Sequence, residues 1–443
     1  MSTAGPGIER RRAAAVALGG MVMYVLVGLL IAPAIQALYY GDPDVFYGPG
    51  HFNDARQYAL ICSQGYGVPY SPLPTLEVSR LNWMPVYAAL QCALHHLAGI
   101  SLVYTGAVIS TAAAGLSLFL GVQILANLGV HRAAVYAWAI LIPPIGAAWL
   151  YLPGAEATYL AVGMAVMWLI TLPPSPETPR GQRGELIRAL AGFPAGMAFI
   201  LTKPNALAML LPLTFAFFYQ SWQRSQAVGY AFGLWQFIAD VVIDHSPFRF
   251  ALRRPDPLRP LRYAWAPATI AAGIALGFAG WLAYSSLLSG IPFYFLQQQL
   301  NVWGRAWPGG NLGEMLLYFA QAFRDPDGSP WRYNAAWNLA ANLAALIPAA
   351  SPRVPGLLRG MLPLMVIFLL YSGAVHGSDR YMLSTAAVAL GWACWVAAGE
   401  GSRRTSALRW GWLLVLAVVT SSLLLFQMLP RGEPQAWGIV DLP

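Results

Sequence analysis

Residues 102–127 read LVYTGAVISTAAAGLSLFLGVQILAN, a long apolar run without a charged side chain. About 20 apolar helical residues cross the hydrocarbon core of a bilayer, so this run is long enough to span a membrane. The same pattern recurs along the chain, and its shorter examples need tilt or burial among neighbouring helices. The candidate spans are 14–38, 102–127, 133–152, 156–173, 189–202, 205–221, 263–288, 334–350, 357–376, 381–398 and 410–429. The sequence therefore predicts an all-α polytopic membrane protein that crosses the bilayer about ten times.

The composition agrees with this prediction. The residues AVILMFWYC make up 58% of the chain and DEKR only 10%, whereas a soluble domain carries about 25% charged residues. Lipid must therefore cover much of the surface, and we interpret 1–443 as a single integral membrane domain. Three arginines, Arg10 to Arg12, precede a first apolar run that continues to about Leu38. That run is longer than the apolar part of a signal peptide, so we expect an uncleaved first span.

The basic residues predict which ends of the candidate spans face the cytoplasm. All the basic clusters between spans fall on one side, which the positive-inside rule makes cytoplasmic together with the N-terminus. These clusters are Arg10–Arg12, His131-Arg132, Arg180/Arg183/Arg188, Arg224 through Arg262, Arg353/Arg359 and Arg403/Arg404/Arg409. The opposite, outer side receives a first loop with juxtamembrane helices (39–101) and a second loop (289–333). Segment 83–99 must then lie along or partly in the outer interface, and 222–262 becomes a cytoplasmic interfacial segment.

Chemically diverse residues gather on the outer side, beginning in the first outer loop. Asp54, Tyr58, Ile61, Cys62 and Gly65 recur at the spacing of one helix face. This pattern predicts a helix at the membrane surface with Asp54 at its entrance. The alternative is that Asn53 or Asp54 simply caps that helix.

Two further ionisable residues interrupt apolar segments. Glu156 stands at the outer end of a span, where a charge suggests function because its desolvation is costly; the alternative is a carboxylate that stabilises the N-terminus of the following helix. Lys203 precedes Pro204, which breaks a helix and would let the ammonium face a cavity. The alternative is a snorkelling lysine. The pieces on either side of this break form either two spans or one broken helical hairpin.

Two more outer stretches carry polar groups. Asp379 and Arg380 occupy a very short loop, where an arginine fork suits a phosphate; the alternative is a structural pair of Arg380 with Asp379, Glu156 or Asp54. The stretch that contains Gln298, Trp303 and Arg305 combines amides, indoles and a guanidinium, which suit a sugar and its phosphate. An interfacial aromatic belt would explain the indoles but not the amides.

The three cysteines, Cys62, Cys92 and Cys394, have no metal-ligand spacing and make no disulfide framework. A bridge between Cys62 and Cys92 is one interpretation, but buried thiols are the interpretation that we favour. The absence of a nucleotide-binding motif argues against an ATP-driven pump.

The outer motifs, taken in order, resemble a known family. They are Asp54-x3-Tyr58-x2-Ile61-x3-Gly65-Tyr66, Trp83-Met84-Pro85-Val86-Tyr87, Pro153-Gly154-Ala155-Glu156, Leu201-Thr202-Lys203-Pro204-Asn205, Gln298…Trp303-Gly304-Arg305…Pro308 and Arg380-Tyr381-Met382-Leu383. This series resembles bacterial relatives of the glycosylphosphatidylinositol second mannosyltransferase (PIG-V-like) family, within the GT-C superfamily of membrane glycosyltransferases. The chain departs from such relatives at Asn53, where they usually have Trp, and at Lys203, where they often have Arg. The loop from Gly67 to Leu81 is also similar to polyprenyl-phosphate-mannose mannosyltransferases of actinobacterial glycolipid synthesis.

The resemblance implies a GT-C-type bundle of about 10–12 transmembrane helices. The Ala/Arg/Pro-rich composition suggests a bacterial plasma membrane; in a eukaryote the outer side would be the lumen of the endoplasmic reticulum. It implies transfer of a sugar, mannose by resemblance, from a polyprenyl-phosphate carrier to a lipid or glycan acceptor on the outer face, with inversion. Asp54 would be the catalytic base, and Glu156 would hold the acceptor or a divalent metal, so that metal dependence stays open. The cations for the leaving phosphate would be Lys203, Arg305 and Arg380. The remaining substrate-binding residues would be Tyr58, Asn205, Gln298, Trp303 and Asp379.

Two other functions fit the same residues. A secondary transporter or flippase of lipid-linked sugars would place its binding groups near the bilayer midplane, often within an inverted repeat. A non-catalytic membrane assembly subunit would tolerate replacement of Asp54. No nucleic-acid partner is expected, because the arginines sit in short loops where they set topology.

Overall fold

The computed structural model describes residues 53–67, 79–130, 154–172, 179–227, 265–301, 346–352, 354–372 and 386–397, with a few isolated positions besides. Every regular element within these ranges is a helix, so the expected all-α fold is confirmed there. The elements are α3 (Asn53–Gln64), η1 (Arg80–Asn82), α4 (Pro85–Ala98), α5 (Leu102–Asn127), α7 (Ala155–Thr171), α8 (Pro179–Thr202), η2 (Pro204–Met209), α9 (Leu210–Ala227), α13 (Trp265–Ser289), α14 (Tyr294–Asn301), α17 (Ile347–Ala350), α18 (Gly356–Ser372) and α20 (Ala386–Ala397).

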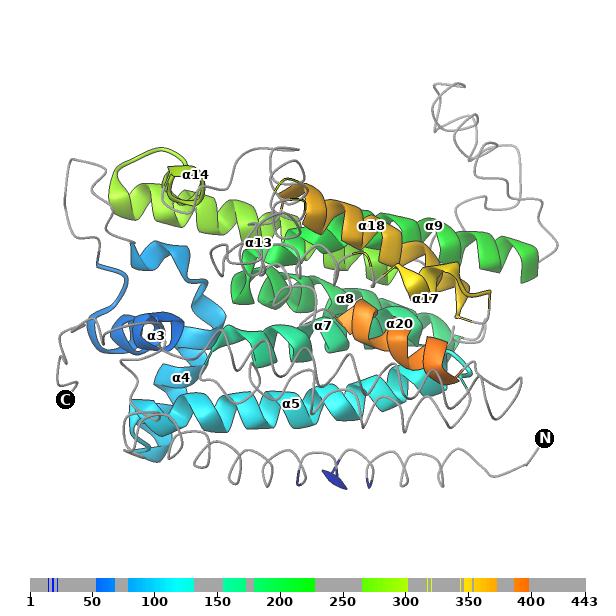
Figure 1. The fold of residues 1–443 in the computed structure, drawn as a ribbon, viewed down its shortest axis with the longest axis horizontal. Helices are drawn as coiled ribbons and strands as arrows, with labels where there is room; N and C mark the ends of the chain where they lie inside the picture. Colours follow the sequence, from blue (N-terminus) through cyan, green and yellow to red (C-terminus); the bar gives the residue numbers. More distant parts are fainter. Residues whose placement is uncertain are drawn as a thin grey trace.

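The long helices lie side by side along the long axis of the molecule (Figure 1). Among the described residues, three helices are long and apolar enough to cross a membrane: Val108–Asn127, Arg183–Thr202 and Trp265–Ser289. Shorter apolar helices pack with them and supply most of the remaining core. The bundle therefore presents the membrane-spanning architecture that the apolar runs predict.

The predicted spans lie where the structure has helices, but some of them differ from those helices in length. The span expected at 102–127 is α5, and the one expected at 263–288 is α13, shifted by one or two residues. The span expected at 189–202 was too short, because α8 begins at Pro179 and its first turns carry polar residues that hydropathy excludes. The α8 arm is long enough to cross a membrane alone, and the choice between two spans and one broken hairpin stays open. The runs 14–38, 133–152, 334–350 and 410–429 lie wholly or largely outside the described residues.

Helices α8 and α13 run parallel and pack closely at glycine residues. Gly192 and Gly196 of α8 face Ala266 to Ile270 of α13, and Gly273 of α13 faces the backbone of α8. A Cβ atom at Gly273 would lie 2.9 Å from the Met197 nitrogen and would overlap the carbonyl oxygen of Phe193. Small residues four apart allow two backbones to approach this closely, which is a common way for membrane helices to associate.

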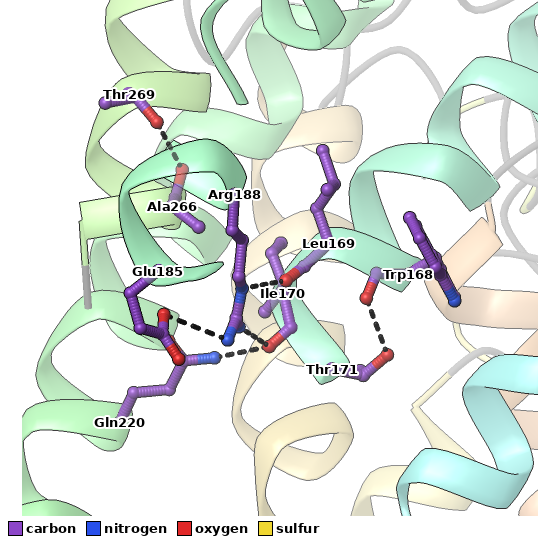
Figure 2. A network of polar contacts seen from close by, with 9 residues as sticks. All are labelled: Trp168, Leu169, Ile170, Thr171, Glu185, Arg188, Gln220, Ala266 and Thr269. Carbon is purple, nitrogen blue, oxygen red and sulfur yellow. Dashed lines mark hydrogen bonds and ion pairs between the residues drawn. The ribbon is translucent and has the colours of Figure 1, made fainter. Parts of the chain in front are cut away.

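A buried arginine holds together the end of the bundle where α7 finishes (Figure 2). Arg188 of α8 donates from Nε to the carbonyl oxygen of Leu169 at 2.6 Å, and from its second terminal nitrogen to that of Ile170 at 2.8 Å. Gln220 of α9 also donates to Ile170, and Glu185 accepts from Arg188 at 3.4 Å. The last carbonyls of a helix lack partners within the helix and carry partial negative charge, so a guanidinium there is favourable. Arg188, expected only as a topological charge, thus has a structural role.

Candidate functional site

The other end of the bundle, which we call the α3 end, collects the outer elements of the predicted topology. It holds α3, η1, α4, α14, the first turn of α7, the break after α8 and the last turns of α13. Figure 1 shows α3, α4 and α14 together at this end, far from α17 and the last turns of α9. Segments 39–101 and 289–333, which are far apart in sequence, are therefore neighbours through their described parts.

A buried ion pair lies at the α3 end. The ammonium Nζ of Lys203 donates to Oε1 of Glu156 at 2.6 Å, and the two side chains are only 8% and 4% exposed. A charge buried this deeply needs a partner of opposite sign. The snorkelling alternative for Lys203 is therefore wrong. Glu156 also lies in the first turn of α7, so it can stabilise that helix end as well.

The backbone around Pro204 places the ammonium at this position. Helix α8 ends at Thr202, and Lys203 is extended at φ −153° and ψ 139° before the 3-10 turn η2 begins at Pro204. A residue before proline is pushed out of helical geometry by contact with the proline ring. The break predicted from the sequence is confirmed, and Asn205 lies in η2, partly buried.

Two tyrosines pack beside the pair. Tyr58 of α3 meets Tyr87 of α4 edge to face, with ring centroids 4.6 Å apart. Tyr87 is fully buried and shares an apolar cluster with Tyr58 and Ala155, the residue next to Glu156. Burial raises the pKa of Tyr87 above its usual value and the Glu156 charge raises it further, while the nearby Ser110 side chain acts in the opposite direction. The Tyr87 ring thus remains neutral and can donate a hydrogen bond but cannot act as a base.

Helix α3 carries Asp54 to this end. The helix predicted there is confirmed at Asn53–Gln64, with Tyr58 and Ile61 buried on the expected face. Asp54 occupies the first turn, one turn before Tyr58, and its side chain lies outside the described part. The helix ends at Gln64, and Gly65 follows with a φ of 73°, which glycine adopts without strain.

A disulfide joins α3 to α4. Cys62 is bonded to Cys92, with their Cα atoms 5.2 Å apart. The expectation of buried free thiols at these two positions was wrong, although it holds for Cys394, which is free and buried. A spacing of 30 residues could not reveal the pairing, because it depends on α3 folding back along α4.

The two outer segments meet through amides. Asn82 of η1 donates to Oε1 of Gln298 at 3.2 Å and accepts from Gln299 at 3.0 Å. Gln298 in turn donates to the Tyr294 hydroxyl at 3.2 Å. The amide run singled out in the sequence therefore joins α14 to η1, and a sugar-binding role for Gln298 stays a prediction. Asn82 is a member of this cluster that the sequence did not indicate.

Aromatic side chains connect the segment after α3 to α13, and a basic side chain connects it to α3. The Tyr66 hydroxyl donates to the Trp83 carbonyl at 3.1 Å, and its ring contacts Trp281 of α13 edge to face. Arg80 donates to the Gln64 side chain at 2.6 Å, at the end of α3. The segment after α3 is therefore tied both to the helix before it and to a membrane-spanning helix.

Four expected site residues lie outside the described residues: Trp303, Arg305, Asp379 and Arg380. Within the described ranges, no group of three or more His, Cys, Asp or Glu side chains is placed to hold a metal ion. The part of the expected site that the structure brings together therefore consists of Tyr58, Glu156 and Lys203, with Asp54 on the same helix as Tyr58.

No protein-family model matches the chain, and no curated protein matches its sequence. Among solved structures, it is similar to ArnT from Cupriavidus metallidurans bound to undecaprenyl phosphate, with a TM-score of 0.48 and 16% identity over 91% of this chain and 64% of that one. It is also similar to an oligosaccharyltransferase from Archaeoglobus fulgidus in complex with Zn and sulfate, with a TM-score of 0.44 and 14% identity over 92% of this chain and 54% of that one. The chain thus spans less than two thirds of the length of either protein. Both similarities are distant and concern the overall fold only.

Proposed function

We propose that this chain is a membrane glycosyltransferase that moves a sugar, mannose, from a polyprenyl-phosphate carrier to a lipid or glycan acceptor at the α3 end. The observation that carries the proposal is the buried Lys203–Glu156 pair beside the helix that bears Asp54. The carrier and the sugar come from the motif resemblance of the sequence. Undecaprenyl phosphate, found on the Cupriavidus ArnT, is a lipid of the same class.

The proposed reaction is a single displacement at the anomeric carbon. The acceptor oxygen forms a bond to the anomeric carbon while the bond between that carbon and the phosphate oxygen breaks. The configuration at the anomeric carbon therefore inverts. Asp54 takes the proton of the acceptor hydroxyl, and the transition state resembles an oxocarbenium ion. The leaving polyprenyl phosphate keeps the bonding electron pair and needs cations at fixed positions.

Lys203 is suited to bind that phosphate. Its ammonium is held by Glu156 in the first turn of α7, so it is already oriented before a donor binds. Charges fixed in advance stabilise developing negative charge without the cost of reorganisation. In this proposal Arg305 and Arg380 supply further positive charge, while Asn205, Gln298, Trp303 and Asp379 bind the sugar and acceptor.

We infer that the α3 end faces the outside of a bacterial plasma membrane. Among the described residues, Arg183 and Arg188 of α8 and Arg359 of α18 lie at the opposite end, and the positive-inside rule would make an end with such basic residues cytoplasmic. The disulfide between Cys62 and Cys92 is an independent argument, because such bonds persist in oxidising compartments and are rare in the cytosol.

The test uses purified protein in detergent with radiolabelled polyprenyl-phosphate-mannose and a membrane-lipid extract. We expect label to move to a new glycolipid or glycan, and Asp54→Asn to lower kcat by about 10²- to 10⁴-fold because the base is lost. The control is Arg183→Met, which removes an exposed charge at the far end of the bundle. Adding EDTA to the assay tests whether a divalent metal takes part.

Other outcomes would point elsewhere. Transfer that survives Asp54→Asn would keep the enzyme and remove Asp54 as its base. If no polyprenyl-phosphate sugar is transferred, but the chain in proteoliposomes moves such a lipid between leaflets, it is a flippase. With neither activity, an assembly subunit is the remaining function.

A further inference from the structure

Helix α3 is joined to α4 at two points on one face. Tyr58 packs on Tyr87, and one turn further along α3, Cys62 is bonded to Cys92. Asp54, Tyr58 and Cys62 are spaced at i, i+4 and i+8, so these positions follow one stripe of the helix. The face that carries Asp54 is therefore the face that the two links hold.

The two links together fix more than either does alone. A ring contact by itself leaves α3 free to pivot and to roll about its own axis, whereas a second, covalent attachment about 6 Å along the helix prevents both motions. Position 54 lies about one turn beyond the links, so a small roll of α3 would displace this residue. Displacement of a catalytic group by about 1 Å can lower a rate about 100-fold.

We propose that Cys62 and Cys92 are positioning residues of the transferase site, whose disulfide holds the Asp54 face of α3 in register with α4, so that transfer requires the oxidised pair. This inference rests on the proposed function. A dithiol reductant supplies two electrons and two protons, converting the disulfide into two thiols while it becomes a cyclic disulfide. Oxidised glutathione reverses the change by thiol–disulfide exchange.

The first arm of the test does not need activity. Protein purified without reductant, then denatured and alkylated, is expected to take one label, on Cys394, and three labels after reduction with dithiothreitol. Hydrogen exchange of the folded protein should then rise in 53–64 on reduction, while 155–171 stays protected. Three labels without reduction would overturn the inference, and so would hydrogen exchange in α3 that does not change on reduction. Both results count even if no transfer had been found.

The second arm measures transfer. Reduction of the folded protein should lower kcat by about 10- to 100-fold with less change in KM for the donor, and oxidised glutathione should restore it. The variants Cys62→Ser, Cys92→Ser and the double variant should all be as slow as the reduced protein and should not respond to reductant. Cys394→Ser is the matched control and should behave as the unmodified chain does. Full transfer by protein that carries three free thiols would refute the positioning role, whereas no transfer by oxidised protein would refute the proposed function.

Discussion

At the scale of single residues, the Glu156–Lys203 pair is the most costly feature of the α3 end to disturb. Both charges have left water, and their mutual attraction offsets a desolvation penalty of similar size. Such a pair adds little net stability compared with apolar residues of similar volume. Removing one partner is different, because the other charge then stays buried without compensation.

We therefore expect Lys203→Met and Glu156→Gln each to lower the free energy of unfolding by about 3–5 kcal/mol. The double variant should lose clearly less than the sum, because it leaves no unpaired charge. Unfolding in detergent, followed across this double-mutant cycle, measures the coupling. Arg183→Met on the exposed start of α8 is the control and should change stability by about 0.5 kcal/mol or less. Additive losses would contradict the pairing.

Tyr87 gives the same end a dependence on alkaline pH. An unfolded tyrosine titrates near its ordinary pKa of 10.0, whereas the pKa of buried Tyr87 is higher. Its contribution to stability is thus fully present below pH 10 and is lost as the pH rises above that value. Between pH 9 and pH 11, the free energy of unfolding should fall less in Tyr87→Phe than in the unmodified chain. From pH 7 to pH 9, the two free energies of unfolding should change with pH in the same way. Equal losses above pH 10 would show that Tyr87 does not titrate as a buried group.

At the scale of elements, close helix packing depends on single glycines. Along α13, Gly273 lies against the backbone of α8, whereas Gly280 has open space where a Cβ atom would stand. The two positions are on one helix two turns apart, so they differ in their neighbours and not in their secondary structure.

We expect Gly273→Ala to lower the free energy of unfolding by about 1–3 kcal/mol, since the added methyl group forces α8 and α13 apart. Gly280→Ala should be neutral or raise it by up to about 1 kcal/mol, because alanine is the better helix former. Thermal unfolding of both variants in the same detergent measures the difference. Equal effects would mean that this close approach is absent in solution.

The elements show what the sequence could and could not predict. The apolar runs predicted α5 and α13, and Pro204 predicted the break, because those signals are local. The partner of Lys203 could not be predicted, since Glu156 is 47 residues away and several carboxylates were available. The disulfide was missed for the same reason. The structural role of Arg188 was missed, because a charge count cannot distinguish a solvated arginine from one that caps a buried helix end.

At the scale of the whole molecule, the bundle has two chemically different ends. The α3 end holds the disulfide, the ion pair of Lys203 and the amide cluster. The end around Arg188 holds helix termini closed by hydrogen bonds to backbone carbonyls. If the groups at the α3 end bind substrate as proposed, they suit chemistry at a membrane surface better than alternating access, which needs groups near the bilayer midplane.

The orientation of these ends can be tested in intact bacterial cells with a membrane-impermeant maleimide. In a Cys394→Ser background the native disulfide leaves no other free thiol, so His96→Cys on α4 and Gly184→Cys on α8 each provide one exposed target. We expect the thiol at 96 to be labelled in intact cells and the thiol at 184 only after permeabilisation. Alkylation after denaturation controls for the presence of each thiol. The reverse pattern would place the α3 end in the cytoplasm, where neither an enduring disulfide nor transfer on the outer face would be expected.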